Sequence, residues 1–226
     1  MGTPAAVLFD NDGLLLDTES VWTRGEQDLF ESRGIEFTLA NKHELVGASA
    51  EIAGEILARR LGEPGNEAAL IAELDELVFA ELEGGIDAMV GARELVAALR
   101  GRDVPLALVS NSPARFIARA LEIADMADEF EVVVSGHEVA APKPAPDPYL
   151  AACELLEVRP LEGFALEDSP TGVTAARAAG LRVIGIPSIP GVVLEGAHHV
   201  FPSLEHAELA ELLGVAAGGG ERPIVP

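Results

Sequence analysis

Short apolar runs alternate with amphipathic segments along this chain, and this alternation constrains the fold more than any other feature. The runs predict buried strands at 7–9, 106–109, 132–134, 164–166 and 183–186. Segments of helical periodicity separate the later runs, at 92–100, 113–123, 146–156 and 171–179. Strands joined by helices are typical of βα units, so we predict an α/β protein whose core is a Rossmann-like parallel sheet with helices on both faces.

The alternation is interrupted once, by a long interval without a strand pattern. After the first run the next strand is expected only near Val104, and the interval has helical periodicity at 19–32, 50–61 and 67–83. The simplest account is a small α-helical cap, residues 18–89, inserted after the first strand. The Rossmann-like core then comprises residues 1–17 and 90–226, with hinges near residues 16–17 and 84–85.

The charge of the chain limits its partners. It has 38 acidic and 15 basic residues, which gives a net charge of −23. Such an acidic surface repels nucleic acids and anionic lipids, so neither a nucleic acid nor a membrane is expected as a partner. The chain has neither a basic, apolar leader nor a run approaching the ~18 apolar residues of a membrane span, and we expect a cytoplasmic protein. An anionic substrate would need a local positive field.

Polar residues follow the first predicted strand, in the sequence Asp10-Asn11-Asp12-Gly13. Two carboxylates two residues apart can both point into one site as the backbone turns away from the strand. One can attack as a nucleophile while the other donates a proton to the leaving group. The same residues are also typical of a tight turn, so this segment by itself fits a turn as well as a catalytic pair.

Three further polar segments follow predicted strands. The Ser-Asn-Ser sequence at 110–112 can bind phosphate through a hydroxyl and backbone N–H groups, although Ser112 can equally cap the next helix. Lys143 lies between prolines, which suits a preplaced positive charge; the alternative is an ordinary solvated lysine. Glu167 and Asp168 provide hard oxygen ligands for Mg²⁺, or cap a helix. All three segments are expected at the carboxyl edge of the sheet, together with the first.

In this combination the four segments resemble the motifs of the haloacid dehalogenase superfamily, in its β-phosphoglucomutase-like and sugar-phosphatase-like branch. The resemblance spans about residues 5 to 205, and the motifs occur in the family order. It implies a core with an inserted helical cap, Mg²⁺ as the cofactor, and phosphotransfer through an aspartyl phosphate. Relatives that cleave C–Cl or C–P bonds lack an acid at the place of Asp12, so its presence favours phosphate esters.

The resemblance also implies a role for seven core residues. The catalytic residues are Asp10 as the nucleophile, Asp12 as the general acid and base, and Lys143. The phosphate-binding residues are Ser110, Asn111 and Lys143. The metal ligands are Asp10, Asp12 through its backbone carbonyl, Asp168, and Glu167 as a second ligand or its support.

The acceptor of the phosphoryl group separates a phosphatase from a mutase. A mutase binds a bisphosphate and needs cations in its cap, and the β-phosphoglucomutase pattern provides an arginine in a Gly-x-Ser-Arg turn. Here Ala50 occupies the arginine position, and residues 61–92 contain no Lys or Arg. Lys42 or a cap arginine would compensate only if the cap folds it inward. The chain is therefore predicted to be a phosphatase acting on a small organic phosphate such as a sugar or polyol phosphate. A phosphosugar mutase is the alternative, and a non-catalytic binding module is less favoured.

Five residues of the cap are candidates for substrate contacts: Glu19, Trp22, Lys42, His43 and Ser49. Each has a plainer interpretation. Trp22 can pack between cap helices, and the Lys42-His43 pair can belong to a solvated helix face. We expect a monomer that binds a small phosphate ester.

Overall fold

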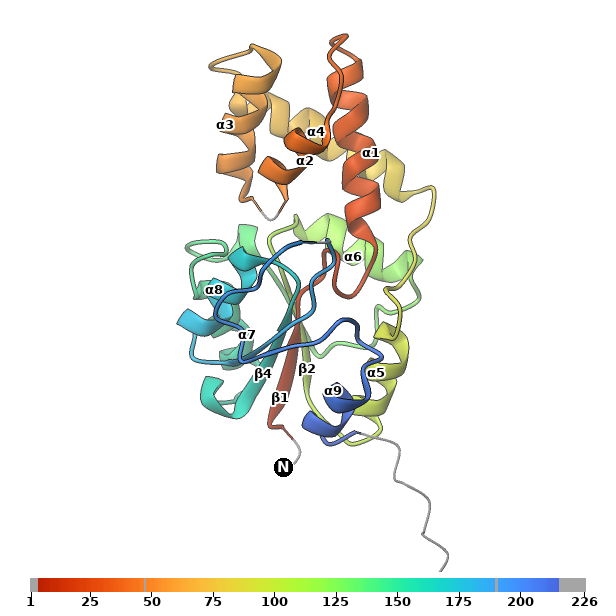
Figure 1. Ribbon diagram of the computed structural model, residues 1–226, viewed down its shortest axis with the longest axis vertical. Helices are drawn as coiled ribbons and strands as arrows, with labels where there is room; N and C mark the ends of the chain where they lie inside the picture. The colour runs from red at the N-terminus through yellow and green to blue at the C-terminus, as the bar shows by residue number, and fades with distance from the viewer. Residues whose placement is uncertain (1–3, 47, 190, 216–226) are drawn as a thin grey trace, which may run out of the picture.

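The computed structural model describes residues 4–46, 48–189 and 191–215 (Figure 1). Its centre is a sheet of six parallel strands in the order β3-β2-β1-β4-β5-β6. The strands are β1 (Ala6–Phe9), β2 (Leu106–Ser110), β3 (Val132–Ser135), β4 (Gly163–Glu167), β5 (Arg182–Gly185) and β6 (His199–Val200). All five predicted strands are present, and the α/β fold class is confirmed.

The strand order places a switch point beside β1. The chain continues from β1 to β2 and β3 on one side, and to β4, β5 and β6 on the other. In open parallel sheets, ligands bind outside the carboxyl ends of the strands where the order reverses. Phe9, the last residue of β1, pairs with Leu108 of β2 and Leu166 of β4. Asp10 therefore leaves the sheet in the crevice between these two strands.

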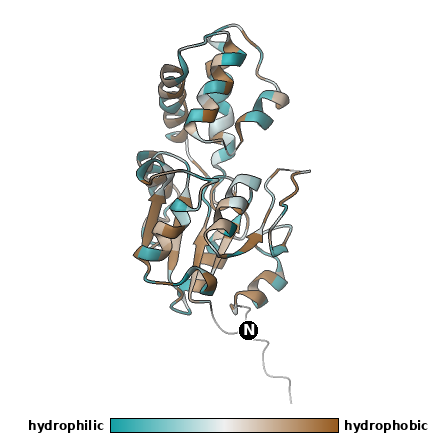
Figure 2. Ribbon diagram, turned by 90° about the vertical axis from the view of Figure 1, so that its left-hand side faces the viewer, coloured by the Kyte–Doolittle hydropathy of each residue, from teal (hydrophilic) through white to brown (hydrophobic). Residues whose placement is uncertain are grey.

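Helices cover both faces of the sheet, as predicted (Figure 1). Alternate strand residues point to opposite faces, so Val7 and Phe9 pack in one cluster and Ala6 and Leu8 in the other. The first cluster includes side chains of α5 (Ala92–Arg100), α6 (Ala114–Ile123) and α9 (Ala207–Leu212). The second includes side chains of α7 (Asp147–Leu155) and α8 (Pro170–Ala178). The apolar strands enclosed in this way are the brown arrows among the helices in the lower part of Figure 2.

Four helices lie together above the carboxyl ends of the strands (Figure 1). They are α1 (Thr18–Glu31), α2 (Leu39–Leu45), α3 (Ala50–Leu61) and α4 (Glu67–Leu82). The chain enters and leaves this group through two segments that run side by side. Asp17 N donates to Asp87 O at 2.9 Å, and Met89 N donates to Leu15 O at 2.9 Å. This pairing supports our proposal that the cap comprises residues 18–89.

Helix α6 of the core contacts the cap. Arg115 and Arg119 of α6 form ion pairs of 2.7 Å with Glu76 and Glu83. The ring of Trp22 lies 5.5 Å from that of Phe116, also in α6. Trp22 thus packs between the cap and the core rather than only between cap helices.

Two α-helices and one strand of the structure were not predicted: α2, α9 and β6. They are seven, six and two residues long, which is too short to show a periodicity. α2 begins at a capping box, in which Thr38 and Asn41 bind each other's backbone N–H. No helix in the described ranges is both long and apolar enough to cross a membrane.

Candidate active site

Asp10 and Lys143 form the centre of the site. Nζ of Lys143 donates hydrogen bonds to Oδ1 of Asp10 at 2.6 Å, to Oε1 of Glu167 at 2.7 Å and to the carbonyl of Val109 at 2.8 Å. These partners come from the ends of β1, β4 and β2. The lysine is only 3% exposed, so it is not a solvated side chain. Its three ammonium protons are all directed to fixed acceptors.

Burial and neighbouring charges shift both pKa values strongly. Burial raises the pKa of Asp10 well above its usual value; Lys143 opposes this shift, and Glu167 and Asp168 add to it. Burial acts to lower the pKa of Lys143, but Asp10 and Glu167 outweigh it and hold that pKa above its usual value. The lysine is therefore a permanent cation, and one cation does not balance the carboxylates around it.

Asp10, Glu167 and Asp168 form a group that fits a divalent cation. Each offers a carboxylate oxygen, and these oxygens lie within 4.8 Å of one another. Hard carboxylate ligands at this spacing suit Mg²⁺ or another hard divalent ion. Burial, with the charge of Glu167, raises the pKa of Asp168 to about 8 in the metal-free protein. A bound cation would take the place of the proton that these raised pKa values favour on the carboxyl groups.

The loop after β1 approaches this group closely. Gly13 has φ of +81°, and a Cβ atom there would lie 2.7 Å from Oδ2 of Asp168. Only glycine accepts both the conformation and the contact. Oδ2 of Asp168 also accepts a hydrogen bond of 2.6 Å from Ser188. Glycine at this position therefore lets the loop after β1 approach Asp168 after β4.

Asp12 lies in the same loop and is held by three hydroxyl groups. Oδ2 accepts from Ser110 at 2.5 Å and from Ser112 at 2.9 Å, and Oδ1 accepts from Thr18 at 2.7 Å. The carboxylate lines the cavity described below. Ser110 is fully buried and is not among the residues that line this cavity. The hydroxyl group of Ser110 instead positions Asp12 through its hydrogen bond.

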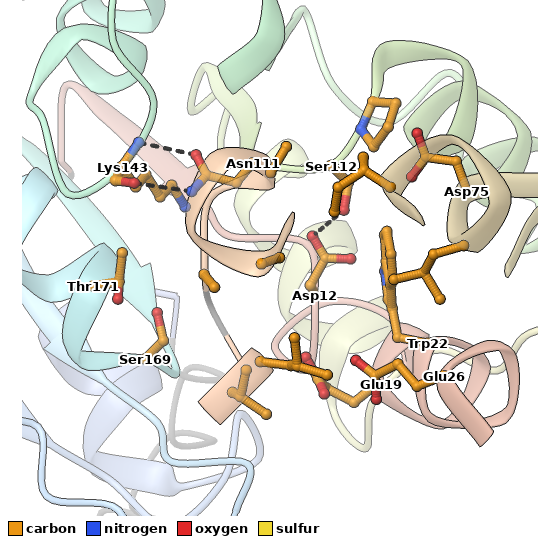
Figure 3. A pocket seen from close by; sticks show the side chains of 18 of the residues that line it. Asp12, Glu19, Trp22, Glu26, Asp75, Asn111, Ser112, Lys143, Ser169 and Thr171 are labelled. Carbon is orange, nitrogen blue, oxygen red and sulfur yellow. Dashed lines mark hydrogen bonds between the residues drawn. The ribbon is translucent and has the colours of Figure 1, made fainter. Parts of the chain in front are cut away.

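The interpretation of Ser112 as a helix cap is wrong. α6 begins at Ala114, its N-cap position is Pro113, and no side chain caps it. The hydroxyl of Ser112 instead faces Asp12 (Figure 3). Proline lacks the N–H that a helix N-terminus would otherwise leave unpaired, which relaxes the need for a cap.

Asn111 fixes the loop that carries Lys143. Its Nδ2 donates to the carbonyl of Lys143 at 3.0 Å, and its Oδ1 accepts from the backbone N–H of Lys143 at 2.9 Å (Figure 3). Both ends of the amide are used in this reciprocal pair. The side chain thus positions the lysine from a distance of 32 residues in the sequence.

A cavity of about 930 Å³, its open mouth included, separates the cap from this edge of the sheet. Asp10, Asp12, Asn111, Ser112, Lys143 and Asp168 line it from the core. Apolar residues of the cap cover the opposite side: Leu45, Val46, Ala50, Ala53, Ile71 and Leu74. A polar wall on the core side and an apolar wall on the cap side suit a small organic phosphate.

The structure brings three of the five cap candidates to the cavity. Glu19, Trp22 and Lys42 line it, whereas His43 is exposed and Ser49 caps α3 by accepting from the N–H of Ile52. Neither His43 nor Ser49 is among the lining residues in the described ranges.

Five polar lining residues had no predicted role in the site: Glu26, Asp75, His137, Ser169 and Thr171. Glu26 had a detectable signal, because Glu19, Trp22 and Glu26 are spaced i, i+3 and i+7 on one helix face (Figure 3). Asp75 is in α4 and His137 follows β3, so only the docking of the cap on the core brings them together.

Comparisons with known proteins agree with this geometry. A family model described as haloacid dehalogenase-like hydrolase matches residues 4–180. Hexitol phosphatase B of Escherichia coli K12 is 30% identical over 193 residues, which are 83% of this chain and 87% of that protein. The phosphorylated carbohydrates phosphatase of Thermotoga maritima is 32% identical over 185 residues, 80% of this chain and 84% of that protein. A variant of CbbY from Rhodobacter sphaeroides, solved with xylulose 1,5-bisphosphate, superimposes with a TM-score of 0.80 at 27% identity, covering 91% of this chain and 96% of CbbY. The chain belongs to the haloacid dehalogenase-like hydrolases.

Proposed function

We propose that this protein is a Mg²⁺-dependent phosphatase that hydrolyses a sugar or polyol monophosphate through an aspartyl phosphate on Asp10. One observation carries the proposal: Lys143 binds Oδ1 of Asp10 at 2.6 Å inside a buried acidic group that opens onto a cavity. This contact leaves Oδ2 of Asp10 available. A carboxylate fixed by a cation at the wall of a cavity is suited to attack a bound phosphate.

The first half of the reaction transfers the phosphoryl group to the enzyme. Asp10 attacks phosphorus, the bond from phosphorus to the ester oxygen breaks, and the departing alcohol takes a proton from Asp12. In the second half Asp12 takes a proton from water, which attacks the aspartyl phosphate and releases inorganic phosphate. Asp12 returns to its protonated form and Asp10 to its carboxylate. The hydroxyl groups of Ser110, Ser112 and Thr18 keep Asp12 in place throughout.

Mg²⁺ would be held by Asp10, Asp168 and the backbone carbonyl of Asp12, with Glu167 as a further ligand or as support. Glu167 already accepts hydrogen bonds from Lys143 and from the hydroxyl of Tyr149, which favours the supporting role. The cation supplies positive charge to the transferring phosphoryl group. Lys143 adds to it, so the local field opposes the net charge of −23 on the whole chain.

Water is the proposed acceptor, with a phosphosugar mutase as the alternative. Two relatives are named as phosphatases of hexitols and of phosphorylated carbohydrates. Ala50, at the position of the arginine in the mutase pattern, lines the cavity without a charge. We also propose that the protein acts as a monomer. A non-catalytic module is less favoured because Asp10 and Lys143 are both present and form a hydrogen bond with each other.

Phosphate release from a panel of phosphate esters with Mg²⁺ tests the proposal. We expect turnover by the wild-type protein, no measurable turnover by Asp10→Asn, and a phosphorylated Asp10 peptide in acid-quenched wild-type samples. Asp28→Asn, an exposed change of the same kind in α1, should keep full activity. Substantial activity of a folded Asp10→Asn protein would contradict the mechanism. Glucose 1-phosphate with a glucose 1,6-bisphosphate primer separates isomerisation by a mutase from phosphate release.

A further inference from the structure

Lys42 is a buried cation in the cap half of the cavity. It lies in α2, and its Nζ is 2.9 Å from Oε2 of Glu19 and 2.9 Å from Oε2 of Glu26, both in α1. Lys42 is 8% exposed and Glu26 is 4% exposed. Lys42 donates a hydrogen bond to Glu26, whereas Oε2 of Glu19 is buried and accepts no hydrogen bond within the described residues. Both carboxylates nevertheless lie close enough to offset the charge of Lys42.

No other cation of the cap compensates for this. Among the residues that the structure describes, the cap has four arginines, and none of them lines the cavity. All four pair with acids elsewhere: Arg24 with Glu81, Arg33 with Glu63 and Glu73, and Arg59 and Arg60 with Glu44. The cap side of the cavity therefore has one cationic side chain, Lys42, and three acidic side chains, Glu19, Glu26 and Asp75. Even with Glu26 protonated, Glu19 alone balances Lys42, so this half has no net positive charge.

We infer that Lys42, Glu19 and Glu26 form a specificity triad, whose two carboxylates accept hydrogen bonds from the hydroxyl groups of the substrate and which excludes a second phosphate. This inference rests on the proposed function, because it concerns the part of the substrate that lies away from Asp10. The two carboxylates retain oxygens that can accept from hydroxyl groups, which suits a sugar or polyol. A second phosphate would meet three carboxylates and a cation that is already paired, in a cavity with apolar walls where such repulsion is strong.

The triad predicts a preference that one matched pair of compounds measures. Fructose 6-phosphate and fructose 1,6-bisphosphate differ in one phosphate. Each is tested as a substrate, and as a competitor of p-nitrophenyl phosphate hydrolysis, so that a compound that is not turned over still yields an inhibition constant. For the wild-type protein we expect the monophosphate to be favoured at least 10-fold, in kcat/KM or in Ki.

At pH 8, where Glu26 is ionised, Glu26→Gln and Glu19→Gln each remove one negative charge and keep the shape of the side chain. Each releases Lys42 from a charged partner, so we expect the preference to shift toward the bisphosphate by at least 10-fold. Glu44→Gln is the matched control, because it also removes a carboxylate from the cap, in the same helix as Lys42, but does not alter the cavity. It should leave the preference within 2-fold of wild type. Circular dichroism verifies that each variant is folded.

The outcomes separate this inference from the proposed function. If the folded wild-type protein hydrolyses none of the phosphate esters, p-nitrophenyl phosphate included, the proposed function is wrong. If it hydrolyses p-nitrophenyl phosphate but favours the bisphosphate or treats the two fructose phosphates alike, the specificity triad alone is overturned. It is also overturned if Glu19→Gln and Glu26→Gln shift the preference no more than Glu44→Gln does. A shift confined to the two triad variants supports it.

Discussion

Nζ of Lys143 lies 2.6 Å from Oδ1 of Asp10, although the two residues are 133 positions apart in the sequence. The same nitrogen contacts Glu167, so a single buried ammonium group joins the ends of β1 and β4. Removing it would leave at least two buried carboxylates without a compensating charge. Breaking a buried ion pair from one side typically costs more than forming the pair gains.

Replacing Lys143 by Met should therefore abolish turnover and lower the free energy of unfolding by about 3–5 kcal/mol. Urea denaturation with and without Mg²⁺ measures the stability, and Mg²⁺ should restore part of the loss because it offsets the same charges. Lys143→Arg is the companion variant: it keeps the charge, but its planar guanidinium group cannot reproduce three convergent hydrogen bonds. A loss below about 1 kcal/mol for Lys143→Met would show that the carboxylates are not coupled through the lysine.

Mg²⁺ should stabilise the folded protein independently of activity. At a concentration of about 100 Kd, binding adds about 2.7 kcal/mol, which for a chain of this length raises Tm by roughly 5–10 °C. Asp168→Asn removes a proposed ligand and should reduce this increase to a small fraction, while EDTA should abolish turnover of the wild-type protein. The thermal shift is measured by calorimetry with Ca²⁺ and Na⁺ as comparison ions. An equal shift in Asp168→Asn would place the metal elsewhere.

Asp12→Asn should separate the two halves of the reaction. The amide cannot exchange protons with the leaving alcohol or with water, so kcat should fall by about 10²–10⁴-fold. With p-nitrophenyl phosphate, whose leaving group needs less protonation, the first half should be less impaired, and the aspartyl phosphate should accumulate. Rapid acid quenching and mass spectrometry of the Asp10 peptide detect it. Activity near the wild-type level would remove Asp12 from the proton transfer.

Gly172→Ala should destabilise the protein strongly. A Cβ atom at this position would overlap the carboxylate of Glu167, a fully buried side chain that is fixed by Lys143. Such an overlap cannot be relieved without moving the site, and we expect a loss of at least about 3 kcal/mol. Gly101→Ala is the control, since the nearest atom to its Cβ would be at 3.3 Å. Chemical denaturation of both variants compares them, and equal losses would refute the close contact.

Glu26 should make stability depend on pH. Burial, opposed by Lys42, raises the pKa of Glu26 from 4.5 to about 7. Between these values the folded state binds the proton more tightly than the unfolded state, so this group's contribution to stability falls as the pH rises from about 4.5 to about 7. Lys42 and Glu19 face the group, and Lys42, whose pKa is held above its usual value by the two glutamates, stays charged over this range.

Glu26→Gln should remove that contribution. We expect the difference in unfolding free energy between variant and wild type to change by about 1–3 kcal/mol between pH 5 and pH 8, in favour of the variant at the higher pH. Urea titrations at both pH values measure it. Glu44→Gln should show no such change in its favour at high pH, because hydrogen bonds from Arg60 and Arg59 hold the pKa of Glu44 below its usual value. A constant difference across this range would mean that Glu26 is ionised throughout.

The local sequence determined the elements and the catalytic residue types. A parallel strand that is buried on both faces is a short run of apolar residues, and this pattern made all five predicted strands recognisable. Helices such as α3 and α5 have the predicted bounds because their apolar residues recur with a period near 3.6. The four polar segments at strand ends were recognisable for the same reason, since a parallel sheet brings its carboxyl ends to one edge. Segments with too few residues to show a period, such as α2 and β6, could not be recognised from the sequence.

Tertiary structure decided which of these residues act on one another. The sequence does not distinguish a capping serine from one that binds Asp12, because both follow a strand and precede a helix; the close approach of the loops after β1 and β2 selects the second. Likewise, Lys42 is as compatible with a solvated face as with a cavity wall until α2 packs against α1 and places it between Glu19 and Glu26. Local patterns specify residue types and elements, whereas charge pairing depends on distances that exist only after the elements pack together.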